Sequence, residues 1–161
     1  MRRLIVLGGL VGSFLLVAFT GWGFASTPSA HVTSTAPLVI LKAKDGETLA
    51  LARAVIQGRA FPFLIDTGSS KTLVDEALAR KLHLKTVGKP INVTGVGCSE
   101  PASKVRLSRW SIGGQALPNI VATSSVIAGA NGKAFGLLGS DVLSHFGTIS
   151  IDYAHGELTL G

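Results

Sequence analysis

Apolar residues occur along most of the chain in short runs that are interrupted by glycine and polar turn residues. Short runs rich in Val, Ile, Leu and Phe and bounded by turn signals are typical of β-strands. Pairs such as Asp45-Gly46 and Gly113-Gly114 separate neighbouring runs and predict tight turns. The pattern predicts strands over 37–44, 49–56, 60–65, 72–74, 91–96, 103–112, 115–124 and 137–139, and a closing hairpin over 149–160.

One segment departs from this pattern and predicts a short helix over Asp75–Leu82. Asp75 is a good helix cap, and the acidic residues precede the basic ones, which suits the helix dipole. The chain has 161 residues with 20 glycines and 6% aromatic residues, which favours one small β domain over a helical bundle. We therefore expect an all-β domain with one or two short helices.

The N-terminal segment has a different composition. Arg2 and Arg3 precede a run without charged residues over 4–25, and a bilayer is spanned by about 20 apolar residues. Residues 1–25 are therefore predicted to be a signal peptide or a transmembrane anchor. Either alternative places the remaining chain on the extracytoplasmic (periplasmic) side of the cell membrane, or exports it. Residues 26–36, rich in Ser, Thr, Pro and Ala, predict a flexible linker before a folded domain at 37–161.

The remaining composition limits the partners. The formal net charge is +6, but the basic residues are scattered, so nucleic acid is not an expected partner. The four histidines and the single cysteine, Cys98, show no metal-ligand spacing, so we expect neither a metal nor another cofactor. One cysteine also excludes a disulfide within the chain.

A carboxylate stands at the end of the most apolar predicted strand. The segment Phe61–Ser70 runs from apolar residues directly into Asp66, Thr67, Gly68 and Ser69. A buried carboxylate is costly unless it is hydrogen-bonded, paired or protonated. The hydroxyls of Thr67 and Ser69 are potential donors to it, and Gly68 permits close approach of another group.

The sequence Asp66-Thr67-Gly68-Ser69 resembles the active-site signature of aspartic proteases. In that family a later apolar strand ending in glycine, here Leu137-Leu138-Gly139, passes behind the catalytic turn and leads into a short helix. The resemblance covers 37–161 and is closest to the retropepsin-like, single-lobe proteases of the bacterial membrane-anchored type. It implies a small closed β-barrel that is active as a homodimer on peptide or protein substrates.

Peptide hydrolysis by carboxyl groups needs two of them, one as a base for water and one as an acid. Asp-Thr-Gly occurs once, and Asp75, Asp141 and Asp152 lack its turn context. The second carboxylate is therefore expected to be Asp66 of a second chain, related by a two-fold axis. By the resemblance, Thr67 bonds across that axis, Gly68 lets the two turns meet, and Ser69 donates to the outer oxygen of Asp66.

The resemblance also implies a flap, a hairpin that covers the substrate. Its tip is predicted near residues 95–101 and includes Gly95, Val96, Gly97 and Cys98. Cys98 is then either a free thiol or the partner of its symmetry mate in a disulfide between two flaps.

Two further functions stay open at this point. A membrane-tethered module that binds peptides or dimerises, but does not cleave, would use the same fold. A structural envelope protein would carry the Asp66 motif by accident.

Overall fold

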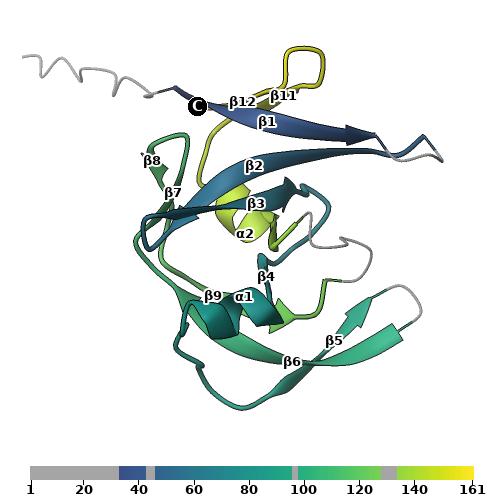
Figure 1. The fold of residues 1–161 in the computed structure, drawn as a ribbon, viewed down its shortest axis with the longest axis vertical. Coiled ribbons are helices and arrows are strands. Elements are labelled where there is room, and N and C mark those ends of the chain that lie inside the picture. The colour runs from purple at the N-terminus through teal and green to yellow at the C-terminus, as the bar shows by residue number, and fades with distance from the viewer. Residues whose placement is uncertain (1–32, 43–45, 96–97, 128–133) are drawn as a thin grey trace, which may run out of the picture. The chain divides into compact units, whose positions relative to one another are not determined.

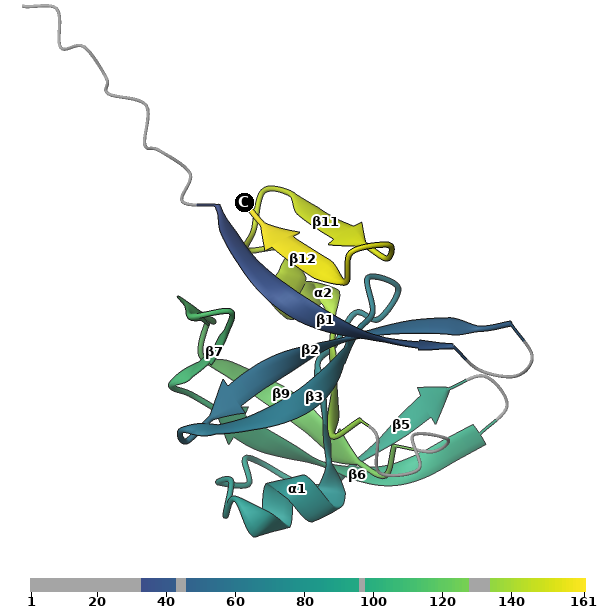
Figure 2. The same ribbon diagram turned by 45° about the horizontal axis from the view of Figure 1, so that its top comes forward.

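The computed structural model describes residues 33–42, 46–95, 98–127 and 134–161. Over these residues the chain is mostly β-strand, with two short helices (Figures 1 and 2). The strands are β1 (Ser34–Lys42), β2 (Thr48–Ile56), β3 (Arg59–Ile65), β4 (Leu73–Asp75), β5 (Ile91–Gly95), β6 (Cys98–Leu107), β7 (Trp110–Ile112), β8 (Gln115–Ala116), β9 (Ile120–Ser125), β10 (Gly136–Leu138), β11 (Ile149–Asp152) and β12 (Glu157–Leu160). The helices are α1 (Glu76–Lys81) and α2 (Ser140–Leu143).

The strands form one sheet with the order β11-β12-β1-β2-β3-β10-β4-β9-β6-β5, and β7 branches from β2 to pair with β8. The prediction of a mostly β fold is confirmed, but the prediction of a closed barrel is wrong for the described strands. The two end strands, β11 and β5, each pair with one neighbour only. Figures 1 and 2 show why: the β11–β12 and β5–β6 hairpins lie at opposite ends of the domain.

Strand β10 lies between β3 and β4, the strands on either side of the Asp66 turn. It runs parallel to β3, with Leu138 opposite Ile65, and antiparallel to β4. A strand from late in the chain therefore separates two strands that are close in sequence. This arrangement matches the predicted passage of Leu137-Leu138-Gly139 behind the motif.

The hydrophobic core follows the two-residue periodicity of the strands. In β3 the buried side chains are Phe61, Phe63 and Ile65, which alternate with more exposed ones. Gly136 of β10 faces this row, and a Cβ atom there would lie 2.2 Å from the ring of Phe63. The absence of a side chain at Gly136 thus lets the Phe63 ring pack directly against β10.

Several boundaries differ from the sequence predictions, among them the start of β6, which lies at Cys98 rather than at residue 103. β1 begins at Ser34, inside the predicted linker, because Ser34–Pro37 pair with the last strand, β12. The predicted strand over 103–112 is divided after Leu107, because Arg109 takes a left-handed backbone with a φ of 53°. The predicted strand over 115–124 is divided into β8 and β9, and β9 begins at Ile120.

Other local predictions agree with the structure. Asp75 caps α1 by accepting hydrogen bonds from the amides of Ala77 and Leu78, at 3.0 and 3.3 Å. Gly113 and Gly114 both have positive φ and form the turn between β7 and β8.

The predicted anchor at residues 4–25 lies outside the described residues. Neither of the two helices in the described part of the chain is long and apolar enough to cross a membrane.

Candidate active site

Asp66 stands where β3 ends and turns toward β4. Its amide donates to the carbonyl of Leu138 at 3.1 Å, and its own carbonyl accepts from the amide of Ser69 at 3.3 Å. The side chain is half-buried, and its Oδ1 accepts from the Gly68 amide at 2.9 Å. The turn thus fixes both the backbone and the carboxylate of Asp66.

The end of β10 is packed tightly against the far side of this turn. The Ser140 amide donates to the Ser69 carbonyl at 2.8 Å. A Cβ atom on Gly139 would lie 2.6 Å from the carbonyl carbon of Lys71 and 2.7 Å from its oxygen. Only glycine fits between the two chain segments, so the Gly139 of the motif strand has a direct steric role at the site.

A buried hydroxyl connects the turn to α2. Thr72 has no exposed surface, and its Oγ1 donates to Asp141 Oδ1 at 2.8 Å while accepting from the Gly139 amide at 3.1 Å. The Thr72 amide donates to the same Asp141 oxygen at 2.9 Å. The sequence predictions note only that Asp141 lacks the turn context of Asp66, and they give Thr72 no role. The available signal was a hydroxyl inside a predicted strand next to the motif, which would need a buried partner.

Ser69 differs from the expectation. Its Oγ donates to the Lys71 carbonyl at 2.8 Å, so its proton is used within the turn and does not reach Asp66. The prediction that Ser69 donates to Asp66 is therefore wrong in this structure. The reason is that the turn places the Lys71 carbonyl within hydrogen-bond distance of the Ser69 hydroxyl, and the Gly68 amide supplies the donor to Asp66 instead.

Thr67 and Gly68 lie on the open side of the turn. Both residues are exposed. A Cβ atom on Gly68 would lie 3.3 Å from Asp66 Oδ1, closer than most real contacts. Their predicted roles across a dimer axis stay predictions.

The other described aspartates are engaged elsewhere in the chain. Asp75 caps α1, Asp141 holds Thr72, and Asp152 accepts hydrogen bonds from the amides of Ala154 and His155. Within the described residues, the Asp66 carboxylate accepts one hydrogen bond, from the Gly68 amide. The described residues also contain no group of three or more His, Cys, Asp or Glu side chains suited to a metal ion.

The predicted flap falls on the β5–β6 hairpin. Its strands pair from Ile91 opposite Ala102 to Gly95 opposite Cys98. The hairpin tip is therefore shorter than the predicted 95–101. Val96 and Gly97 lie outside the described residues.

The fold and the site together define a single lobe of the acid-protease type, in which one Asp-Thr-Gly turn is backed by a threaded strand. The sequence matches the model of the aspartyl protease family over residues 52–142, and the chain belongs to that family.

The fold is similar to the crystal structure of a retropepsin-like aspartic protease from Rickettsia conorii, with a TM-score of 0.52 and 23% sequence identity. The match covers 80% of this chain and 92% of that one, and at this identity it establishes the fold alone. A comparison with curated protein sequences found no match.

Proposed function

We propose that the protein is an aspartic endopeptidase that acts as a homodimer, with one Asp66 from each chain in a shared site. The observation that carries the proposal is the fixed Asp66 turn, closed behind by Gly139 and held by Thr72 and Asp141. A single carboxylate cannot act as base and acid at once. Since the other described aspartates have hydrogen-bonding partners in their own chain, a second copy is the simplest source of the missing carboxyl.

In this proposal the two Asp66 carboxyls share one proton, because two like charges about 3 Å apart do not both ionise. The ionised carboxylate takes a proton from water, and the water oxygen attacks the peptide carbonyl carbon. The protonated carboxyl donates to the carbonyl oxygen as charge develops there. As the carbon–nitrogen bond of the resulting gem-diol intermediate breaks, the leaving amine takes the proton that the first carboxyl received from water. One gem-diol hydroxyl returns its proton to the other carboxylate, so the dyad again holds one proton.

The same proposal assigns roles to Thr67 and to the β5–β6 hairpin. The exposed Thr67 would bond to its counterpart across the two-fold axis. The β5–β6 hairpin, with its tip around Gly95 and Cys98, would cover the substrate as a flap. A free thiol at Cys98 and a disulfide between two flaps both remain compatible with this arrangement.

We further propose that residues 4–25 anchor the domain on the extracytoplasmic side of a membrane, or export it if they are cleaved. The support is the uncharged run that follows Arg2 and Arg3. Two copies held in one membrane would have a raised effective concentration, so even a weak dimer would assemble there.

The proposal is tested with the full-length protein in detergent, using an unfolded protein such as denatured casein across acidic to neutral pH. The Asp66→Asn variant should lose cleavage, whereas Asp152→Asn, an exposed aspartate in the last hairpin, should keep it. A statine-type transition-state mimic should inhibit the wild type. Cleavage that survives in Asp66→Asn would contradict the proposal. A folded dimer that binds peptides without cutting them would favour the non-cleaving module instead.

A further inference from the structure

A second site lies at the other end of β3 from Asp66. A pocket of about 450 Å³ is bordered by the β2–β3 turn, the residues after α1 and the end of β6. β3 runs from Arg59, next to this turn, to Ile65, next to Asp66, and a strand advances about 3.3 Å per residue. The pocket is therefore remote from the proposed catalytic turn. Its volume lies in the range of small-molecule sites, roughly 300–1,000 Å³. It is lined by Ile56, Gln57, Gly58, His83, Leu84, Lys85, Arg106, Ser108 and Arg109.

Three lining residues have a backbone conformation that normally selects glycine. Gln57, His83 and Arg109 have φ values of 50°, 50° and 53°, and they are the described non-glycine residues with positive φ. Such a backbone costs free energy for a residue with a Cβ atom. Strained residues of this kind tend to gather at functional sites.

Local structure explains the turns and one of the three side chains, because Gln57 Nε2 donates to the Leu82 carbonyl at 3.0 Å and so joins the β2–β3 turn to the end of α1. His83 occupies the position after the cap of α1, where its amide donates to Arg80 at 3.0 Å and the Leu84 amide donates to Ala79 at 3.0 Å. This is the helix-ending motif that usually carries glycine. Gln57 precedes Gly58 in a two-residue hairpin loop, where Asn, Asp or Gly is preferred. His83 and Arg109 have no comparable side-chain hydrogen bond to another described residue, so retaining large polar side chains at these two strained positions suggests that the side chains themselves are used.

The pocket carries several positive charges that have no carboxylate partner. Lys85, Arg106 and Arg109 line it together with His83, and no Asp or Glu does. None of these three cations belongs to an ion pair with another described residue. Lys85 and Arg106 are held side by side because the Arg106 amide donates to the Lys85 carbonyl at 2.9 Å.

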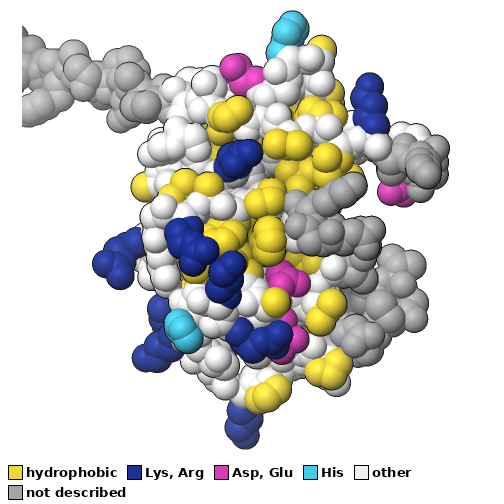
Figure 3. All heavy atoms as spheres, viewed as in Figure 1, with side chains coloured by type: hydrophobic (Ala, Val, Ile, Leu, Met, Phe, Trp, Pro, Cys, Tyr) yellow, Lys and Arg dark blue, Asp and Glu magenta, His cyan; other side chains and the backbone are white. Residues whose placement is uncertain are grey.

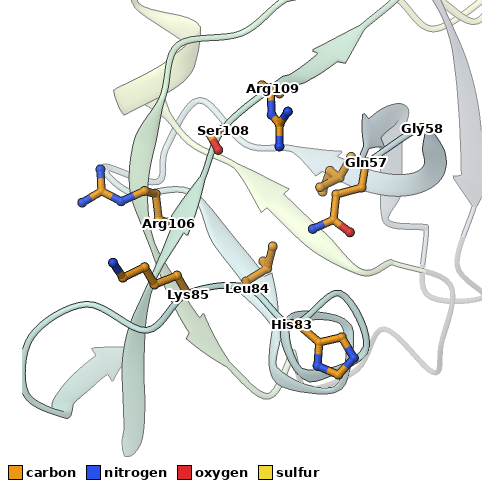
Figure 4. Close-up of a pocket in the computed structure, with 9 residues that line it drawn as sticks. Gln57, Gly58, His83, Leu84, Lys85, Arg106, Ser108 and Arg109 are labelled. Atoms are coloured by element: carbon orange, nitrogen blue, oxygen red, sulfur yellow. The ribbon is translucent and has the colours of Figure 1, made fainter.

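The side chains line the pocket on two rims, and the charged ends of Lys85 and Arg106 extend outward, away from Gln57 and Arg109 (Figure 4). Lys85 and Arg106 lie on one rim and Gln57 and Arg109 on the other, with Leu84 between them. Figure 3 shows Lys and Arg side chains gathered on this half of the domain. Unpaired cations of like charge repel one another, so a bound anion would lower their mutual repulsion.

We propose that this pocket binds a phosphate group, with Lys85, Arg106 and Arg109 supplying the counter-charges. A carboxylate would neutralise only one of three cations, whereas a phosphate monoester carries close to two negative charges at neutral pH. Arginine side chains present paired N–H donors that fit phosphate oxygens. The Ser108 hydroxyl is a further donor, and Leu84 and Ile56 provide an apolar floor for the group that carries the phosphate. The phosphate belongs either to a soluble monoester or to an anionic lipid headgroup.

The first experiment titrates the full-length protein in detergent with inorganic phosphate and with glycerol phosphate, at constant ionic strength set by chloride. Saturable shifts of the Arg106, Ser108 and Arg109 amide signals in NMR spectra are expected. The paired substitution Lys85→Gln/Arg106→Gln should weaken binding roughly tenfold or more, as the loss of charge-assisted hydrogen bonds implies. The matched control Arg53→Gln/Lys89→Gln removes two exposed cations outside the pocket and should bind as the wild type does.

A second variant separates binding from folding. Arg109→Gly replaces a strained residue by the one that its backbone favours, so its melting temperature should be equal to or higher than that of the wild type. The same variant should lose phosphate affinity. A variant that is less stable, or one that is more stable and still binds, would contradict the role given to Arg109.

Lipid vesicles identify the source of the phosphate. The protein is reconstituted into vesicles of phosphatidylcholine alone and into vesicles in which part of the lipid is phosphatidic acid, and the two samples are compared. Saturable binding of glycerol phosphate supports a soluble monoester. Pocket-dependent shifts only with phosphatidic acid support a lipid headgroup. The proposal would be overturned if neither glycerol phosphate nor phosphatidic acid bound saturably. It would also be overturned if the pocket variant and the control variant lost the same amount of phosphate affinity.

Discussion

At the scale of single residues, Gly139 has the tightest steric constraint at the site. A Gly139→Ala substitution would place a Cβ atom 2.6 Å from the Lys71 carbonyl carbon, so the Asp66 turn and β10 must separate. Overpacking of this kind costs about 1–3 kcal/mol. We expect a lower free energy of unfolding in urea and a loss of any proteolytic activity.

The control for this prediction is Gly161→Ala. The nearest atom to a Cβ atom there is 3.5 Å away, which is ordinary contact, so its stability should be close to that of the wild type. Equal stability of the two variants would show that β10 and the turn separate without cost.

Thr72 gives a second residue-scale prediction. Thr72→Val keeps the shape of the side chain but removes the hydroxyl that bonds Asp141 and accepts from the Gly139 amide. Leaving buried polar groups without a partner costs about 1–3 kcal/mol. Urea denaturation should show this loss. Thr72→Ser keeps the hydroxyl and should recover most of the stability, and a Ser variant as unstable as Val would assign the effect to packing instead.

The last hairpin contains a pair whose protonation can be followed directly. His155 Nδ1 lies 2.7 Å from Asp152 Oδ2 on the exposed surface. Hydrogen bonds from the backbone and then from the side chain of His155 lower the pKa of Asp152 below its ordinary value of 3.8. The hydrogen bond from Asp152 raises the pKa of His155 above 6.5.

The sign of each shift sets the pH window of this pair. The contribution of Asp152 is present above pH 3.8 and is lost as pH falls through its folded pKa. The contribution of His155 is present below pH 6.5 and is lost as pH rises through its folded pKa. An NMR titration should give His155 a midpoint above 6.5, and Asp152→Asn should lower it. An unchanged midpoint in that variant would exclude Asp152 as the cause.

At the scale of elements, the first strand makes a prediction about the domain boundary. Ser34–Pro37 pair with Glu157–Leu160, and Ala36 is buried. A fragment that begins at residue 37 therefore removes most of the β1 partner of β12, which keeps only its pairing with β11. Its melting temperature should be lower than that of a fragment beginning at residue 33, measured by circular dichroism. Equal melting temperatures would mean that the β1–β12 pairing adds no stability.

The elements were largely predictable from the sequence because their signals are local. Apolar runs, the Gly113-Gly114 turn and the Asp75 cap each lie within a few residues, and the structure contains each of them. The start of β1 was not predictable in this way. It depends on pairing with residues at the other end of the chain, which no local pattern of Ser, Thr and Pro reveals.

The site was predictable only in part for the same reason. The Asp66 motif and the Leu137-Leu138-Gly139 strand carry a family resemblance, and the structure brings them together. The hydrogen bond between Thr72 and Asp141 joins residues far apart in sequence. The geometry of the turn decides that the Ser69 hydroxyl donates to the Lys71 carbonyl and not to Asp66. Both features are decided by three-dimensional packing.

At the scale of the whole molecule, the proposed dimer makes the sharpest prediction, because each active site would need both chains. The wild type is mixed with an equimolar amount of Asp66→Asn, and the chains are allowed to exchange. About half of the wild-type chains should then pair with inactive ones. Activity per wild-type chain should then fall to about half, provided that a heterodimer does not cleave. The measurement is cleavage of unfolded casein before and after exchange.

The matched control for exchange is Asp152→Asn, which alters an aspartate in the last hairpin and should leave activity per wild-type chain undiminished. A wild-type rate that stays constant with Asp66→Asn, while the two chains demonstrably exchange, would mean that one Asp66 is enough for cleavage. In that case the second carboxyl would have to come from the same chain. Of the described aspartates, Asp75, Asp141 and Asp152 are held in other hydrogen bonds, so if one of them served, that bond would have to break during catalysis and its asparagine variant would lose activity.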